Sequence, residues 1–460
     1  MQKFRVRQVG ALLVGLALVA ASCGDDKKDS TDSVAPTTVA DTTPAETTVP
    51  ETVAPPAAGS ELAGFKGTTP ALPISDEFKA RMDATPTGSA GLNDTYSYGP
   101  ETYDAIIIVA LAAAEAGTDG SALADFIVGI TKDGEKCTTF VDCLAIIEAG
   151  GDPDYDGVSG PITMNGNGEP LEASYGIYTF GEGNHIDDSL TTYVGASAPE
   201  SAAKPLGVTD VVREGDGVLA FGGLLPQTGS LAFLAPPEFA GAELAIQEIN
   251  DAGGVLGADV TFSPGDSGDT STDIASQTAD RLIAEGVDAI IGAASSSVTL
   301  TVIDKITAAG IIQFSPANTS LKLVDYPDHS LYFRNAPPDD LQGNVIAQLV
   351  IDDRNSSAYL LVLDDAYGTS LQGVVEAALV AGGVEVLGSV VYDPAAASFD
   401  AEVDAVVAAD PDAIILITFD EGSRILKTMV EKGIGPANKK VYGCDGNTGN
   451  ALGDNFNAGK

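Results

Sequence analysis

Two long stretches of the chain alternate between short apolar runs and amphipathic segments. From residue 218, the runs VLAFGGLLP, DVTFSPGD, VDAIIGA and IIQFSPA predict strands, and the segments between them carry apolar residues at helical spacing. A second series begins near residue 340, with the strand-like runs SAYLLVLDDA, VEVLGSVVYD, DAIILITF and KKVYGCDG. Apolar runs without alternation are typical of parallel strands buried on both faces. The pattern therefore predicts an α/β protein with two doubly wound parallel sheets.

The preceding part, residues 61–195, has a different pattern. One strand-like run, LAGFKGTTPAL, is followed by three helical stretches and then by YDGVSGPITMNGNGEPLEASYGIYTF, which predicts hairpins. The apolar run Ala105–Ala114 is too short to span a bilayer. We expect this part to lack a sheet of its own and to pack against the two sheets.

The N-terminus has the pattern of an export signal. Three basic residues precede the apolar run Val9–Ala21, which ends in AASCG. Small residues directly before Cys23 resemble the lipobox of bacterial lipoproteins, although Ala20 stands where Leu is usual. The resemblance predicts a signal peptide at 1–22, a lipid anchor on Cys23 and, through residue 60, a disordered Thr/Pro-rich linker. The alternative is an ordinary signal peptide with an incidental cysteine.

Composition narrows the class of function. The chain has 460 residues, enough for two medium lobes and tails, and a formal net charge of −43. A strongly acidic surface repels the phosphate backbones of nucleic acids. We therefore do not expect a nucleic-acid partner. His185 and His329 each stand without a neighbouring nucleophile or metal-ligand set. We expect neither enzymatic activity nor a metal or other cofactor.

The remaining cysteines fit an exported protein. Cys137 and Cys143 lie close together in KCTTFVDC and are spaced for a short disulfide loop, worth roughly 2 kcal/mol. The alternative, two reduced core cysteines, is less common outside the cytoplasm. Cys444 is left over and is expected to be a buried thiol.

Several segments together resemble the branched-chain amino-acid-binding family, the type I solute receptors of ABC importers. They are GGLLPQTGSLA with GAELAIQEINDAGGVLG, the stretch IIGAASSSVTLTVIDKITAAGIIQFSPANTSLKL, and the runs ETYDAIIIVALA and YDGVSGPITMNGNGEP. The resemblance covers nearly everything after the linker. It implies two Rossmann-like lobes that close on a small solute in the cleft between them.

The order of these segments departs from the family. Residues 61–195 resemble the family's ending and precede 218–337 and 338–460, which resemble its first and second lobes. The two pieces divide a single copy cleanly, which favours a circular permutation with 196–217 as the new connector. We then expect FKGTTPA to pair beside KKVYGCDG, and Lys460 to lie near Glu61. The rival explanation is a fragment of two incomplete tandem copies.

The resemblance also implies how an amino acid is held. Ser296, in AASSSVT, supplies a hydroxyl to the carboxylate, which a helix N-terminus also favours. Without the resemblance, Ser296 is an ordinary helix N-cap, and both roles are compatible. Ala317 offers a backbone carbonyl, and Thr319 a hydroxyl, to the amino-acid head group of the ligand.

The family resemblance also implies which residues form the opposite wall of the ligand cleft. Tyr367 closes over the ligand, and Asp445 pairs with its ammonium group, where the family often has Glu. Without the resemblance, Tyr367 is simply a tyrosine at a strand–helix turn, and Asp445 is an aspartate in a turn. Leu234, Phe419 and Tyr98 fall near the pocket wall and otherwise are core or rim residues.

These observations predict an extracytoplasmic, lipid-anchored binding protein that delivers an amino acid to an ABC permease. An apolar wall suits leucine, isoleucine, valine or a similar solute, but the family also includes binders of urea, amides and aromatic acids. One alternative is a sensor that presents its ligand to a membrane receptor. An exported amidase is the other, and the chain lacks a nucleophile constellation for it.

Overall fold

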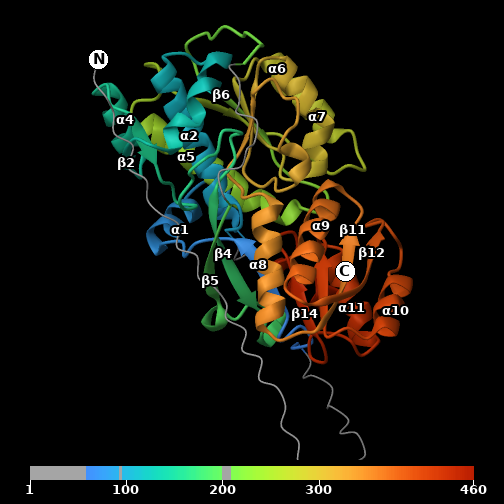
Figure 1. Ribbon diagram of the computed structural model, residues 1–460. Helices are drawn as coiled ribbons and strands as arrows, with labels where there is room; N and C mark the ends of the chain where they lie inside the picture. Colours follow the sequence, from blue (N-terminus) through green and yellow to red (C-terminus); the bar gives the residue numbers. More distant parts are fainter. Residues whose placement is uncertain (1–58, 93–95, 199–208, 460) are drawn as a thin grey trace, which may run out of the picture. The chain divides into compact units, whose positions relative to one another are not determined.

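The computed structural model describes residues 59–92, 96–198 and 209–459, all within one compact unit, Pro55–Lys460. Cys23, the signal peptide and nearly all of the linker lie outside the described residues. The described residues form two large sheets, each with helices packed on it (Figure 1), and one small two-stranded sheet. We refer to each large sheet with its helices as a lobe.

The five-stranded lobe is built on an all-parallel sheet with the strand order β10-β9-β8-β6-β7. Its strands are β6 (Ala220–Leu224), β7 (Thr261–Ser263), β8 (Ala289–Gly292), β9 (Ile312–Ser315) and β10 (Tyr332–Arg334). The four strands expected from the first apolar series are confirmed. The short edge strand β10 was not expected.

Helices cover both faces of this sheet. On one face, α2 (Gly99–Ala116) and α5 (Ala235–Asp251) share a buried cluster with β6, β8 and β9. On the other, α6 (Ile274–Glu285) and α7 (Ser296–Ala308) form a second cluster. Helix α2 belongs to residues 61–195, which we expected to pack against the sheets. Fifteen of its residues, including Ile107 and Val109, are buried, and this expectation is confirmed for α2.

The seven-stranded lobe has the strand order β12-β11-β13-β14-β1-β4-β5. Its strands are β1 (Lys66–Pro70), β4 (Glu172–Thr179), β5 (Thr192–Ser197), β11 (Ser357–Leu363), β12 (Glu385–Tyr392), β13 (Ala413–Ile417) and β14 (Lys440–Gly443). As expected, β1 lies parallel to β14, with Lys66 opposite Tyr442. The expectation of a purely parallel sheet is wrong here, because β4 and β5 extend it in antiparallel sense.

Five further helices belong to this lobe: α8 (Asp339–Asp352), α9 (Ala366–Ala381), α10 (Asp400–Ala409), α11 (Gly422–Glu431) and α12 (Asn450–Ala458). The apolar strands β11 and β13 form the centre of the lobe's main buried cluster. Helices α8 and α12 were not expected. Lys460 lies outside the described residues, but Asn457 of α12 and Glu61 both bind the side-chain nitrogen of Asn184, at 2.8 and 3.0 Å.

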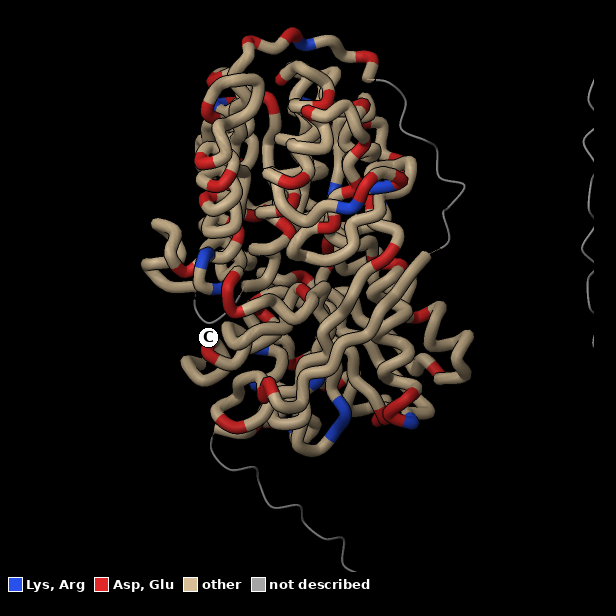
Figure 2. Tube along the Cα trace, turned by 90° about the vertical axis from the view of Figure 1, so that its left-hand side faces the viewer, with Lys and Arg blue, Asp and Glu red and all other residues tan. Residues whose placement is uncertain are grey.

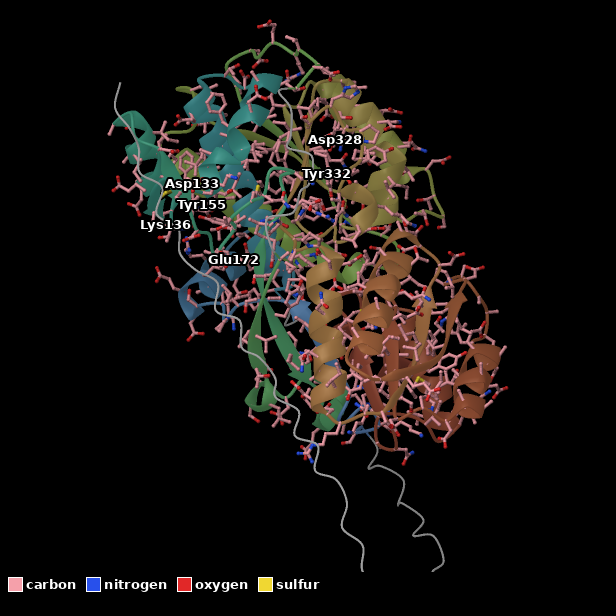
Figure 3. The ribbon with its side chains drawn as sticks, in the orientation of Figure 1. Asp133, Lys136, Tyr155, Glu172, Asp328 and Tyr332 are labelled. Carbon is pink, nitrogen blue, oxygen red and sulfur yellow. A yellow bond between two sulfur atoms is a disulfide. The ribbon has the colours of Figure 1, made fainter. Side chains whose placement is uncertain are left out.

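Residues 61–195 do contain a small sheet of their own, which corrects the expectation that they would have none. Strands β2 (Glu135–Cys137) and β3 (Pro153–Tyr155) pair in parallel, and Lys136 and Tyr155 mark them in Figure 3. Tyr155 donates to the buried carboxylate of Asp104 in α2 at 2.6 Å, which ties this sheet to the five-stranded lobe.

The helices around this small sheet differ partly from expectation. The stretch 121–131 is broken into α3 (Ala124–Ile127) and two 3₁₀ turns, while α4 (Phe140–Glu148) forms as expected and α1 (Asp76–Asp83) is an addition. Cys137 and Cys143 form a disulfide, and Cys444 is a buried free thiol. Both expectations for these cysteines are confirmed.

The described half of the connector is attached to the five-stranded lobe. The Asp119 carboxylate accepts hydrogen bonds from the backbone nitrogens of Asp216 and Gly217, at 3.0 and 2.9 Å. Arg213 forms an ion pair with Asp288, at the start of β8. The segment 209–217 is therefore part of the folded body.

Acidic residues are spread along the traced chain and outnumber basic ones throughout (Figure 2). Within the ranges that the structure describes, no single helix is long and apolar enough to cross a membrane. One bent pair, Gly99–Ala116 with Ser121–Thr131 at 105°, meets that test by length and composition alone.

Candidate functional site

A small pocket lies where residues from the carboxyl ends of strands in both lobes meet. Parallel sheets of this kind bind ligands at that edge. All eight residues expected at the binding site line the pocket: Tyr98, Leu234, Ser296, Ala317, Thr319, Tyr367, Phe419 and Asp445. The structure therefore brings together side chains that are up to 347 residues apart in sequence.

The N-terminus of α7 forms one wall. Ser295, rather than Ser296, is the N-cap, because its hydroxyl accepts from the backbone nitrogen of Val298 at 3.3 Å. Ser296 is the first helical residue, and its hydroxyl accepts from the backbone nitrogen of Ser320 at 3.3 Å. The interpretation of Ser296 as a simple N-cap is thus wrong, and its hydroxyl lies at the pocket instead.

The loop after β9 is held in place by a buried asparagine. The Asn318 side-chain nitrogen donates to the carbonyl oxygens of Ala293 and Ala294, at 2.9 and 2.8 Å. Ser315 also donates to Ala293, at 2.8 Å. These bonds fix the turn that carries Ala317 to the pocket edge.

Asp445 lies at the centre of the opposite wall. Tyr367 donates to its Oδ1 and Tyr98 to its Oδ2, each at 2.6 Å. Burial raises the pKa of Asp445, and the hydrogen bonds from the two tyrosines oppose that shift. Each carboxylate oxygen thus has a phenol donor, and Tyr98 reaches Asp445 from the other lobe.

The position of Tyr98 depends on a tight crossing of α2 and α5. Tyr98 has a left-handed backbone (φ 60°) directly before α2 begins at Gly99. A Cβ at position 99 would lie 2.8 Å from the carbonyl oxygen of Pro237, so only glycine permits this approach. The crossing directs the Tyr98 phenol toward the seven-stranded lobe.

Apolar and aromatic side chains complete the lining. Leu231 and Leu234 come from the segment before α5, and Tyr367 stacks on Phe419 with ring centroids 5.5 Å apart. The free volume is about 20 Å³, room for roughly one water molecule. A larger solute therefore requires the lining residues to move apart.

Four lining residues were not expected: Leu231, Ala294, Ser295 and Gly446. The three consecutive serines at 295–297 were the available signal for Ser295, but they do not show which serine caps the helix. Ser297 makes a contact between the lobes, since its hydroxyl donates to Asp365 at 3.2 Å and accepts from the nitrogen of Ala366 at 2.8 Å.

The reactive groups Cys444, His185 and His329 do not line the pocket. Burial raises the pKa of the Cys444 thiol, whose sulfur lies 2.8 Å from the Tyr367 hydroxyl oxygen. His185 and His329 lie at hydrogen-bond distance from Asp454 and Asp210, respectively. In the part of the chain that the structure describes, no group of three or more His, Cys, Asp or Glu is arranged to hold a metal.

Comparison with known proteins places this chain in a family. Residues 219–455 match the family model described as periplasmic binding protein. Leu/Ile/Val-binding protein homolog 1 of Brucella melitensis is 33% identical over 168 residues, which cover 34% of this chain and 44% of that protein. The chemotactic signal transduction system substrate-binding protein BasB of Halobacterium salinarum is 31% identical over 208 residues, 43% of this chain and 49% of that protein.

Among solved structures, the branched-chain amino acid transporter substrate binding protein LivJ from Streptococcus pneumoniae, in complex with isoleucine, is 24% identical. The match covers 52% of this chain and 67% of that one, with a TM-score of 0.47. The chain spans about half the length of the curated relatives it matches. The family model covers more than half of this chain, which therefore belongs to the periplasmic binding protein family, with the type I fold of two α/β lobes.

Proposed function

We propose that this protein is an extracytoplasmic solute-binding protein that captures a small amino acid for an ABC importer. One observation carries the proposal. A helix N-terminus with the hydroxyl of Ser296, and the buried carboxylate of Asp445, face the same pocket from different lobes. This arrangement complements the two charges of an α-amino acid.

The carboxylate of the solute belongs at α7. The first backbone N–H groups of a helix lack partners within the helix and favour an anion. Ser296 adds a hydroxyl, and Thr319 lies on the same side of the pocket. We assign the backbone carbonyl of Ala317 to the solute's ammonium group, because a carbonyl oxygen only accepts hydrogen bonds.

The ammonium group also belongs at Asp445. In the structure, two phenols occupy the oxygens of this carboxylate. An arriving ammonium can pair with it while Tyr367 and Tyr98 rotate their hydroxyls toward the solute. A desolvated ion pair of this kind is strong because water does not screen it.

The lining suggests an aliphatic solute. Leu231, Leu234 and Phe419 offer apolar surface without a charged group for a polar side chain. Leucine, isoleucine and valine fit this chemistry, in keeping with the name of the Brucella relative. A urea- or amide-type solute is the alternative, since it can bond to Ser296 and Asp445 without needing the apolar wall.

A thermal-shift screen of the twenty amino acids, urea and acetamide tests the proposal. We expect leucine, isoleucine or valine to raise the melting temperature in a concentration-dependent way. A shift with urea or acetamide only would replace the amino-acid proposal. No shift with any of these compounds would contradict it.

Sensing is a second candidate function, because one relative is named as part of a chemotactic signal transduction system. The binding pocket would be the same, and the partner would be a membrane receptor instead of a permease. Crosslinking in intact cells, followed by identification of the linked membrane protein, separates the two functions.

We also propose that the family's order is circularly permuted in this chain. The placement of β1 between β14 and β4 supports this, because residues 66–70 complete a sheet whose other parallel strands come from 357–443. A rearranged gene in which 209–459 precedes 59–198 through a short linker is the test. We expect it to fold with unchanged ligand affinity. A rearranged chain that folds but does not bind, or an unfolded product with several linker lengths, would contradict the permutation.

A further inference from the structure

A larger chamber lies beside the pocket, on the other side of Tyr98. It has a volume of about 500 Å³, within the usual range for small-molecule sites. Its walls come from the segment that connects β1 to α1, the start of α2, the loop at Val158 and Ser159, and strands β4 and β5. Tyr98 lines both cavities and separates them.

The chamber has a buried acid without a side-chain partner. Glu101, in the first turn of α2, is 5% exposed and lines the chamber. Among the described residues, no side chain donates a hydrogen bond to its carboxyl group. Burial raises its pKa to about 8, its own backbone amide opposes the shift, and the charge of Asp104 adds to it.

A second buried carboxyl group interacts with Glu101 without lining the chamber. Glu238 of α5 is fully buried, and neither of its oxygens has a hydrogen-bond partner in the described part of the chain. Glu101 contributes to raising the pKa of Glu238, so the two groups interact electrostatically. A cation bound at Glu101 stabilises the ionised form of that carboxyl group.

The chamber also contains one basic group. The Lys79 ammonium lies 5.6 Å from the centre of the Tyr96 ring and forms no ion pair with any described carboxylate. Tyr178 and Tyr193 provide further aromatic surface. Two acids, buried Glu101 and exposed Asp188, and one base, Lys79, line the chamber together with tyrosines. Buried Glu101 and Lys79 match a molecule with an ammonium, a carboxylate and an apolar body.

We propose that this chamber is a second binding site, for a zwitterionic amine whose ammonium group pairs with Glu101 and whose carboxylate pairs with Lys79. The site does not depend on which solute the pocket at Asp445 takes. Because Tyr98 lines both cavities, a molecule in the chamber contacts the residue that also bonds to Asp445.

Calorimetric titration with 6-aminohexanoate, hexylamine and hexanoate tests the proposal. We expect 6-aminohexanoate to bind the unaltered protein, and Glu101→Gln and Lys79→Met each to weaken that binding about tenfold or more. Hexylamine binding should respond to Glu101→Gln only, and hexanoate binding to Lys79→Met only. Control variants on exposed helix faces, Glu77→Gln and Lys427→Met, should change nothing.

Ser296→Ala distinguishes the chamber from the pocket, and it should leave 6-aminohexanoate binding unchanged. Lys79 is only partly buried, so Lys79→Met keeps the test valid if Glu101→Gln does not fold. No binding to the unaltered protein, or a loss confined to Ser296→Ala, would overturn the proposal. A loss in only one folded chamber variant would overturn the pairing of both charges.

Discussion

Tyr98 donates a hydrogen bond to Asp445 across the two lobes, with 2.6 Å between Oη and Oδ2. Both residues are buried, at 4% and 6% exposure. A hydrogen bond to a charged group contributes about 1.5–3 kcal/mol. This contact therefore links the helix that covers one sheet to the ligand-binding edge of the other.

Removal of the Tyr98 hydroxyl should loosen that link. We expect Tyr98→Phe to lower the free energy of unfolding by about 1–3 kcal/mol in urea titrations, because one Asp445 oxygen loses its donor. Tyr359→Phe is the matched control, since no hydrogen bond to the Tyr359 hydroxyl is found among the described residues. Equal stability of the two variants would contradict a role for the Tyr98 bond.

Binding should change the separation of the lobes. The pocket has about 20 Å³ of free space, so a solute enters only when residues of the two lobes move apart and then close again. Small-angle scattering should show a smaller radius of gyration at ligand saturation than without ligand. A radius that stays the same or grows would argue against closure.

Glu101 should make stability depend on pH. Its pKa is raised from 4.5 to about 8 in the folded protein, so between these values the unfolded chain ionises while the folded one stays protonated. The contribution of Glu101 to stability is then largest below pH 4.5 and falls as the pH rises toward 8, by at most about 1.4 kcal/mol per pH unit. Asp104 and Asp339, with pKa values of about 6 and about 7, add to the same trend.

Glu101→Gln should remove one part of this slope. Urea titrations between pH 5 and 8 should show a shallower decline for Glu101→Gln than for the unaltered protein or for the exposed control Glu77→Gln. Parallel curves for all three proteins would show that Glu101 does not titrate in this range.

Cys23→Ser should release the protein from membranes, since the proposed lipid attaches to this thiol. We expect the variant in the soluble fraction, with unchanged ligand affinity after purification. The unaltered protein should stay with membranes after a high-salt wash, which removes proteins held by charge alone. A variant that still sediments with membranes would place the anchor elsewhere.

Sequence patterns predicted most of the core of this fold. Buried strands such as β13, with five consecutive buried residues, appear as uninterrupted apolar runs. Helix α8 was missed because its buried face includes Asp339, Gln342 and Gly343, which dilute the apolar periodicity. Gly343 is needed because a Cβ there would lie 2.6 Å from the Val374 side chain in α9. Only tertiary packing explains that helix.

Some pocket residues could be placed from strand patterns alone, whereas others could not. Ser296, Tyr367 and Asp445 follow apolar strands, and parallel strands place such positions at one edge. Tyr98 precedes a helix far in sequence from the other pocket residues. Periodicity therefore could not place Tyr98 at the pocket, and only the family resemblance did. The chamber at Glu101 has no sequence signal, because its lining comes from segments between residues 69 and 450 that only the fold brings together.

Calorimetric titration of leucine, isoleucine and valine into the unaltered protein, Asp445→Asn and Asp364→Asn tests the central claim most directly. Asp364 is an exposed residue after β11 and serves as the matched control. We expect at least one of the three amino acids to bind the unaltered protein and Asp364→Asn alike, and Asp445→Asn to lose ~2–5 kcal/mol of binding free energy. Equal affinity of all three proteins, or no binding by the unaltered protein, would contradict the assignment of this pocket to an amino acid.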